Sequence, residues 1–252
     1  MHIQIVGFSH TNALRGALKG ALPFDYPIDI LHMLVEVPGR RFVVDEGGTP
    51  QLDPALRAKV QAVGERDKLV FSQVGGNAHH FLGLFRHPQP FDFILPGQPQ
   101  LALDGAATLL TYAYMAAALR RGVQTDFDLL AALANATSAP ICHIESPPPV
   151  ADSAYCQDHL PPLFQTGAYQ GLTVAAPALR YKMWRLHSAL IAGECRRLGL
   201  GFLPCPPESM DADGFLLPRY YADPLHGNEE YGRLLLRQLA ARADARGGLA
   251  HG

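Results

Sequence analysis

The stretch MHIQIVGFSH (residues 1–10) decides the fold of this chain. Apolar residues dominate positions 3–6, and Gly7 then ends the run before a polar turn. A short apolar run that stops at a turn is typical of a buried strand in a parallel sheet. It is shorter than the apolar core of a secretory signal, and no basic residues precede it. We therefore expect a first strand over 3–6, followed by a turn that presents Ser9.

Similar apolar runs recur along the chain, and segments of helical period separate them. Further strands are expected at 28–35, 69–74, 141–146 and 201–203. Helices are expected at 54–63, 106–121, 178–198 and 228–241. Strands that alternate with helices in this way predict an α/β fold, in which helices cover a parallel sheet of about five strands.

The size of the chain fits a single domain. Its 252 residues are 48% apolar, which is enough to bury one full-sized core. We expect that domain to span 1–241 and the residues 242–252 to form a flexible tail. The segment 78–105 is rich in proline and aromatic residues and is interpreted as an insertion or lid.

The charge pattern limits the possible partners. The formal net charge is only -2 and no run of Lys or Arg occurs, so neither nucleic acid nor an anionic membrane is expected as a partner. No window reaches the roughly 18 apolar residues of a membrane span. The four cysteines lack C-x-x-C spacing and are expected to be buried free thiols. A small or uncharged ligand and a cytoplasmic location are the default expectations.

Three polar motifs follow or adjoin these elements. Ser9 follows the first strand, and Gly75-Gly76-Asn77 follows the strand at 69–74. Asp223 and His226 precede the last helix in the motif DPLH. Open parallel sheets bind their ligands at the carboxyl ends of the strands, so we expect these side chains to meet at that edge.

Together the three motifs describe acyl transfer. A serine hydroxyl is a weak nucleophile, and it needs a base within hydrogen-bond reach and a third group that orients the base. His226 and Asp223 have the spacing for these two roles. The amide of Asn77 and the backbone N–H of Ser9 can donate to an oxyanion.

In their order and strand context, these motifs resemble the SGNH, or GDSL-type, hydrolases. The resemblance covers the chain from Met1 to about Ala241, with 78–105 as an insertion. It implies a three-layer α/β/α fold with a flavodoxin-like parallel sheet, the SGNH hydrolase fold. It also implies a serine esterase or deacylase that cleaves an acyl ester of a small molecule or carbohydrate through an acyl-enzyme, without a cofactor.

The resemblance assigns roles to single residues. Ser9 is the nucleophile, His226 the general base and acid, Asp223 its orienting partner and Asn77 an oxyanion donor. The family's remaining donor is a glycine after the second strand, for which Gly47 or Gly48 is the candidate.

This chain departs from the family pattern beside the reacting groups. Phe8 and Ala78 stand where the family commonly has Asp, and His10 stands where Leu is common. These changes alter the packing around the site and leave the reacting groups intact.

An acyltransferase in a biosynthetic or tailoring pathway is the alternative function. A non-catalytic binding module on the same fold is a second alternative, against which the intact Ser9, Asp223 and His226 argue.

Four residues near the motifs are candidates for substrate binding: His10, His79, His80 and Phe81. Adjacent histidines in an extended segment point to opposite faces, and no carboxylate or thiol has matching spacing. A metal site is therefore not expected.

Overall fold

A computed structural model of the chain describes residues 1–20, 25–36, 38–39, 41–64 and 67–249. Its centre is a five-stranded sheet in the order β2-β1-β5-β8-β9, in which all neighbours are parallel. The strands are β2 (Ile28–His32), β1 (His2–Gly7), β5 (Lys68–Gln73), β8 (Ile141–Ile144) and β9 (Gly201–Leu203). This is the flavodoxin-like strand order. The α/β fold class inferred from the sequence is confirmed.

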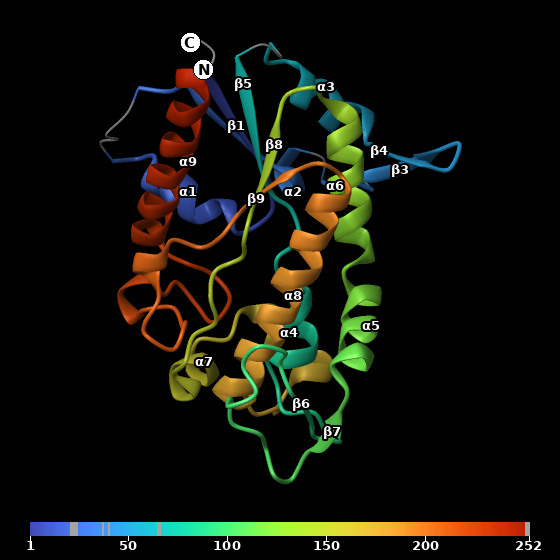
Figure 1. Cartoon of the computed structure of the whole chain (residues 1–252), viewed down its shortest axis with the longest axis vertical. Helices are drawn as coiled ribbons and strands as arrows, with labels where there is room; N and C mark the ends of the chain where they lie inside the picture. Colours follow the sequence, from blue (N-terminus) through green and yellow to red (C-terminus); the bar gives the residue numbers. More distant parts are fainter. Residues whose placement is uncertain (21–24, 37, 40, 65–66, 250–252) are drawn as a thin grey trace.

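Helices cover both faces of the sheet because its side chains alternate between two cores. Ile3 and Ile5 belong to one core, and Val6 belongs to the other. The first core includes residues of α1 (Thr11–Ala17) and α9 (Glu229–Leu249). The second includes residues of α3 (Pro54–Gln61), α5 (Tyr112–Gly122), α6 (Gln124–Ala136) and α8 (Pro177–Arg197). Figure 1 shows α1 and α9 on one side of the sheet and α5, α6 and α8 on the other.

Smaller elements surround this framework. The strands β3 (Val43–Glu46) and β4 (Thr49–Leu52) form an antiparallel hairpin, and β6 (Phe91–Phe93) pairs in parallel with β7 (Thr108–Leu110). The short helices are α2 (Met33–Glu36), α4 (Ala78–Gly83) and α7 (Ser153–Asp158), with 3-10 turns at Pro162–Phe164, Gly167–Tyr169, Pro207–Ser209 and Pro218–Tyr220. In Figure 1, β6 and β7 lie at the end of the molecule opposite the two termini, and α4 lies between them and the sheet.

Polar side chains inside the sheet have partners on α3. The Gln4 side chain donates from Nε2 to the Lys59 carbonyl at 3.2 Å. Lys68 has no exposed surface, and its Nζ donates to the carbonyls of Val60 at 2.8 Å and Val63 at 3.3 Å. A cation on the last carbonyls of a helix also interacts favourably with the helix dipole. These bonds join the end of α3 to β1 and β5.

The strand expected at 28–35 is shorter than the sequence suggests. It ends at His32, and residues 33–36 form α2 instead. His32 pairs with Gly7, the last residue of β1, so the strand has no partner strand beyond that point. The strands expected at 69–74 and 141–146 likewise end at Gln73 and Ile144.

The helix expected at 106–121 starts late, because residues 108–110 pair with β6 as β7. Thr111 then caps the helix, its side chain accepting from the Tyr114 N–H at 3.2 Å. The last helix runs past 241 to Leu249, where a flexible tail was expected. Ala243 is only 1% exposed in the core, so packing continues beyond Ala241. Residues 250–252 lie outside the described part.

The four cysteines are buried and free, as the sequence predicts. Among the described residues, no helix has both the length and the apolar character to cross a membrane.

A buried ion pair ties the segment 78–105 to α8. Lys182 Nζ donates to Asp92 Oδ1 and to the Ala102 carbonyl, both at 2.8 Å. The two side chains are 1% and 5% exposed. The carboxylate also accepts the backbone N–H groups of Phe93 and Asp104 at 2.7 and 2.9 Å. One carboxylate thus fixes both ends of the loop after β6.

Replacing Lys182 by Met should destabilise the protein by about 3 to 5 kcal/mol, because the Asp92 carboxylate would remain buried without its cation. Urea unfolding measures this free energy. The matched control is Lys59→Met, which removes the half-exposed cation paired with Glu36 and should cost at most about 1 kcal/mol. Equal losses in the two variants would contradict this assignment.

Candidate active site

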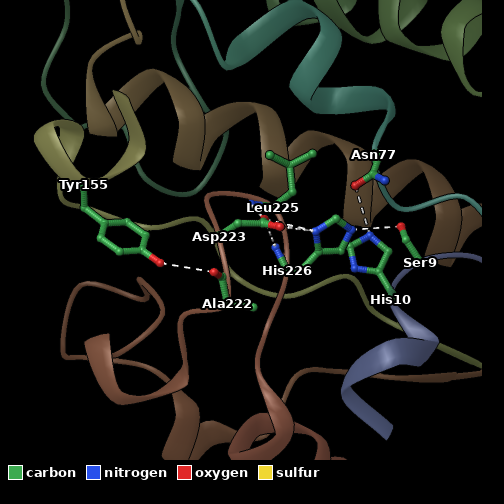
Figure 2. Close-up of polar contacts among 8 residues, drawn as sticks. All are labelled: Ser9, His10, Asn77, Tyr155, Ala222, Asp223, Leu225 and His226. Carbon is green, nitrogen blue, oxygen red and sulfur yellow. Dashed lines mark hydrogen bonds and ion pairs between the residues drawn. The ribbon is translucent and has the colours of Figure 1, made fainter. Parts of the chain in front are cut away.

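Ser9 lies in the turn between β1 and α1, half-buried at the carboxyl edge of the sheet. Gly7 lets β1 and β5 approach closely just before this turn, because a Cβ there would come within 2.6 Å of the Gln73 carbonyl oxygen on β5. The hydroxyl oxygen of Ser9 is 2.8 Å from Nε2 of His226, which is 217 residues away in the sequence. The structure therefore brings together the first and the last of the three motifs, as Figure 2 shows.

The loop that carries His226 is organised by Asp223. One carboxylate oxygen accepts the backbone N–H groups of Leu225 at 2.7 Å and His226 at 2.9 Å. The other accepts from Nδ1 of His226 at 2.8 Å. This is an Asx-type turn, in which a short acidic side chain binds the backbone that follows it. The same carboxylate thus shapes the loop and orients the imidazole.

The hydrogen bonds of His226 set its tautomer. Nδ1 carries the proton, because its partner is a carboxylate that can only accept. Nε2 then has a lone pair directed at the Ser9 hydroxyl. Burial opposes ionisation of Asp223, but the bond from His226 and the two backbone N–H groups together hold the pKa of Asp223 below its ordinary value. The Asp223 carboxylate, the His226 imidazole and the Ser9 hydroxyl therefore stand in sequence.

Leu225 anchors the Asp223–His226 loop. It is 6% exposed and packs in a small core with Leu84, Phe85, Leu160 and Phe164. On the other side of the loop, the Tyr155 hydroxyl donates to the Ala222 carbonyl at 3.4 Å (Figure 2). One leucine in a turn gives no local signal of a tertiary contact, so the role of Leu225 cannot be predicted from the sequence.

Asn77 stands at the N-cap of α4 on the same edge of the sheet. Its side chain makes no capping bond to the helix. Its Oδ1 is instead 3.0 Å from Nε2 of His10, whose ring centre lies 4.8 Å from that of His226. Asn77 therefore connects to the Ser9–His226 pair through His10.

The expectation that Gly47 or Gly48 supplies an oxyanion donor is not met. These two residues form the exposed turn of the β3–β4 hairpin, with φ angles of 65° and 83°. Two positive φ angles are what a tight type I′ hairpin needs, so their role is in the turn. A Cβ built on either would meet no atom within 4 Å, whereas the residue directly after β2 is the buried Met33.

The candidate substrate-binding residues occupy different surroundings. His10, His79 and His80 are 5%, 2% and 6% exposed, whereas Phe81 is 51% exposed. His79 and His80 lie in the helix α4, not in an extended segment, and their ring centres are only 3.9 Å apart. The expected opposite orientation is therefore wrong. Phe81 lines a surface pocket of about 240 Å³ together with Phe85 and Tyr169.

A further histidine joins this group from α8. The ring of His187 lies 4.9 Å from that of His79, and both of its nitrogens are buried without a partner. A histidine on a mostly buried helix carries no local signal, so the sequence analysis missed it. Among the described residues, no group of three or more His, Cys, Asp or Glu side chains is arranged to hold a metal ion.

Burial keeps these histidines uncharged. Desolvation lowers the pKa of His10, and of the buried His143 on β8, to about 3, and that of His187 to about 4. It also holds the pKa values of His79 and His80 well below the ordinary range, and their histidine neighbours add to the effect.

Comparison with known proteins gives only distant similarities. No protein-family model and no curated protein matches the sequence. The structure is similar to an aryl esterase of M. smegmatis, at 16% identity over 97% of this chain and 98% of that one, with a TM-score of 0.45. It is also similar to a carbohydrate acetylesterase from Sinorhizobium meliloti, at 14% identity over 97% of this chain and 99% of that one, with a TM-score of 0.44. The periplasmic domain of a lipopolysaccharide acetyltransferase from Salmonella ser. Paratyphi A is similar at 13% identity over 96% of this chain and 82% of that one, with a TM-score of 0.46. Such values assign neither a family nor an activity to this chain.

The buried histidines predict that the protein loses stability in acid. Their pKa values are below 6.5 in the folded state, so the unfolded chain binds more protons as the pH falls below 6.5. Stability is therefore complete above pH 6.5 and falls toward pH 4, by up to about 1.4 kcal/mol per pH unit for each histidine. Urea unfolding at several pH values measures this slope.

His187→Leu should lower the slope of unfolding free energy against pH by up to about 1.4 kcal/mol per unit, because one proton-binding group is lost from the unfolded chain. The matched control His87→Gln removes a histidine that is exposed in the folded protein, and its slope is the background against which His187→Leu is compared. An unchanged slope in His187→Leu would show that this ring is protonated in the folded state.

Proposed function

We propose that this protein is a serine-dependent ester hydrolase, in which Ser9 is the nucleophile, His226 the general base and acid, and Asp223 its orienting partner. The observation that carries the proposal is the continuous chain of hydrogen bonds, 2.8 Å from Ser9 Oγ to His226 and 2.8 Å from His226 to Asp223. A serine with its own oriented base is suited to attack on an acyl carbonyl. The sequence motifs in SGNH order support membership of that superfamily.

The reaction would proceed in two steps. Nε2 of His226 takes the hydroxyl proton as Ser9 Oγ bonds to the acyl carbon, and the carbonyl oxygen becomes an oxyanion. The Asn77 amide and the Ser9 backbone N–H are the donors for that oxyanion. His226 then gives its proton to the leaving alcohol, which departs from an acyl-enzyme. Water then loses a proton to His226 as it attacks the acyl carbon, and His226 returns that proton to Ser9 Oγ as the bond between Oγ and the acyl carbon breaks and the acid is released.

The substrate class follows from the surroundings of Ser9. The buried histidines of this region are uncharged, so they place no positive charge near a ligand. This favours an uncharged acyl ester of a small molecule or carbohydrate. The segment 78–105 begins directly after Asn77 and carries the exposed Phe81, which supports its role as a wall or lid of the substrate site.

Water is the acceptor that we favour. The side chains of His226 and Asp223 are 21% and 28% exposed, so solvent reaches the base without any rearrangement. An acyltransferase would use the same acyl-enzyme and differ only in the acceptor. Turnover of p-nitrophenyl acetate with added alcohols or sugars separates the two, because transfer would yield a new ester and hydrolysis yields acetate.

Ser9→Ala should abolish covalent labelling by a fluorophosphonate and reduce ester turnover by about 10³-fold or more. Asp223→Asn should reduce kcat by about 10⁴-fold, because the imidazole would lose its tautomer. Mass spectrometry of the labelled protein locates the adduct. The matched control is Ser188→Ala, which removes a buried serine on α8 and should leave labelling intact. Labelling that persists in Ser9→Ala would reject Ser9 as the nucleophile. Wild-type protein that neither labels nor turns over esters would reject the proposal in favour of a binding module.

A further inference from the structure

The side chain of Asn77 is not used for the purpose that its position suggests. Asn is a preferred N-cap residue because its Oδ1 accepts a backbone N–H from the first turn of the helix. Asn77 occupies the N-cap of α4 but makes no such bond. Its Oδ1 accepts from the ring of His10 instead, at 3.0 Å. The amide is therefore held by a residue 67 positions away in the sequence.

This contact fixes which way the amide faces. Oδ1 is only an acceptor, so Nε2 of His10 must carry the proton. Nδ1 of His10 is buried without a partner, which favours the same tautomer, because an orphaned buried N–H is rarer than an orphaned acceptor. With Oδ1 turned to His10, the Nδ2 group lies on the other side of the amide. Figure 2 shows this nitrogen directed away from the His10 ring.

The ring of His10 is itself firmly held. It is 5% exposed and packs against Gly76, the residue before Asn77. A Cβ on Gly76 would come within 2.8 Å of Cδ2 and Nε2 of His10, so a larger residue would push the ring away from the amide. The φ angle of Gly76 is 98°, a conformation that glycine adopts readily and that other residues rarely adopt. The glycine before Asn77 and the histidine after Ser9 thus fit together.

We propose that His10 is a positioning residue, which turns the amide of Asn77 so that its Nδ2 group faces the reacting carbonyl oxygen. This inference rests on the proposed function. An amide rotated by 180° would direct Oδ1 at the developing oxyanion and would repel it. Donors that are already oriented toward the developing charge stabilise it most, because no reorientation is needed during the reaction. His10 acts through Asn77 and does not bind the substrate.

The charge state of His10 is compatible with this role. Desolvation and the neighbouring His226 lower its pKa to about 3, and the bond to Asn77 and the charge of Asp223 only partly oppose them. His10 is therefore neutral when His226 holds the proton from Ser9. The ring can donate to Asn77 without placing a second positive charge 4.8 Å from the ring of His226.

A double-mutant cycle tests the proposal. His10→Phe keeps a ring of similar shape without the donor, and His10→Gln keeps a donor at the position of Nε2. Asn77→Ala alone should lower kcat for an ester by about 10²- to 10³-fold. His10→Phe should lower kcat with KM unchanged, and His10→Gln should recover most of that loss. His10→Phe combined with Asn77→Ala should be no slower than Asn77→Ala, because both changes remove one interaction.

The tautomer of His10 provides a measurement that does not depend on activity. In ¹⁵N-labelled protein at pH 7, the ring of His10 should carry its proton on Nε2, with Nδ1 unprotonated. This also covers the case in which His10→Phe fails to fold. A proton on Nδ1 would overturn the proposal, because Nε2 could not then donate to Asn77.

The outcomes of these measurements are distinguishable. If the kcat losses of His10→Phe and Asn77→Ala multiply in the double mutant, His10 does not act through Asn77. The same conclusion follows if His10→Phe changes only KM. Those results would leave the ester hydrolase intact. Wild-type protein without ester turnover and without labelling of Ser9 would reject the proposed function, and the role of His10 in catalysis with it.

Discussion

The parallel pairing of β1 with β5 is the constraint on which the candidate site depends. The register places Gly7 beside Gln73, so both strands end at the same level of the sheet. Ser9 and Asn77 follow within two and four residues of those ends. The two backbones approach so closely that a Cβ on Gly7 would meet the Gln73 carbonyl. A shift of register by one residue would separate the side chains of Ser9 and Asn77. It would also turn each side chain of the shifted strand to the opposite face of the sheet, and so into the other core.

The third part of the site depends on the packing of α1 against α9. These helices touch at Gly232, where a Cβ would lie 2.1 Å from the Ala13 carbonyl oxygen. Because α1 begins two residues after Ser9 and α9 three residues after His226, their contact brings base and nucleophile together. Leu225 also packs against Leu84 and Phe85, which directly follow α4, and so holds the loop from a second side. Hydrophobic packing therefore sets a geometry that hydrogen bonds then complete.

The surroundings of the site carry a cost in stability. Both nitrogens of His79 and of His187 are buried without a partner, and such groups are destabilising. Proteins retain unfavourable groups most often at functional sites. The ring of His10, 4.8 Å from that of His226, is also buried and neutral, and an additional positive charge there would oppose protonation of His226.

The sequence by itself determined the α/β class, the core strands and the three motifs. These features are local, since alternating apolar residues, strand-ending glycines and the spacing of Asp223 and His226 act over a few residues. Only the tertiary structure decided that His187 lies beside His79. It also decided that His10 binds Asn77. The partner of a side chain depends on strand register and helix packing, and no short stretch of sequence contains that information.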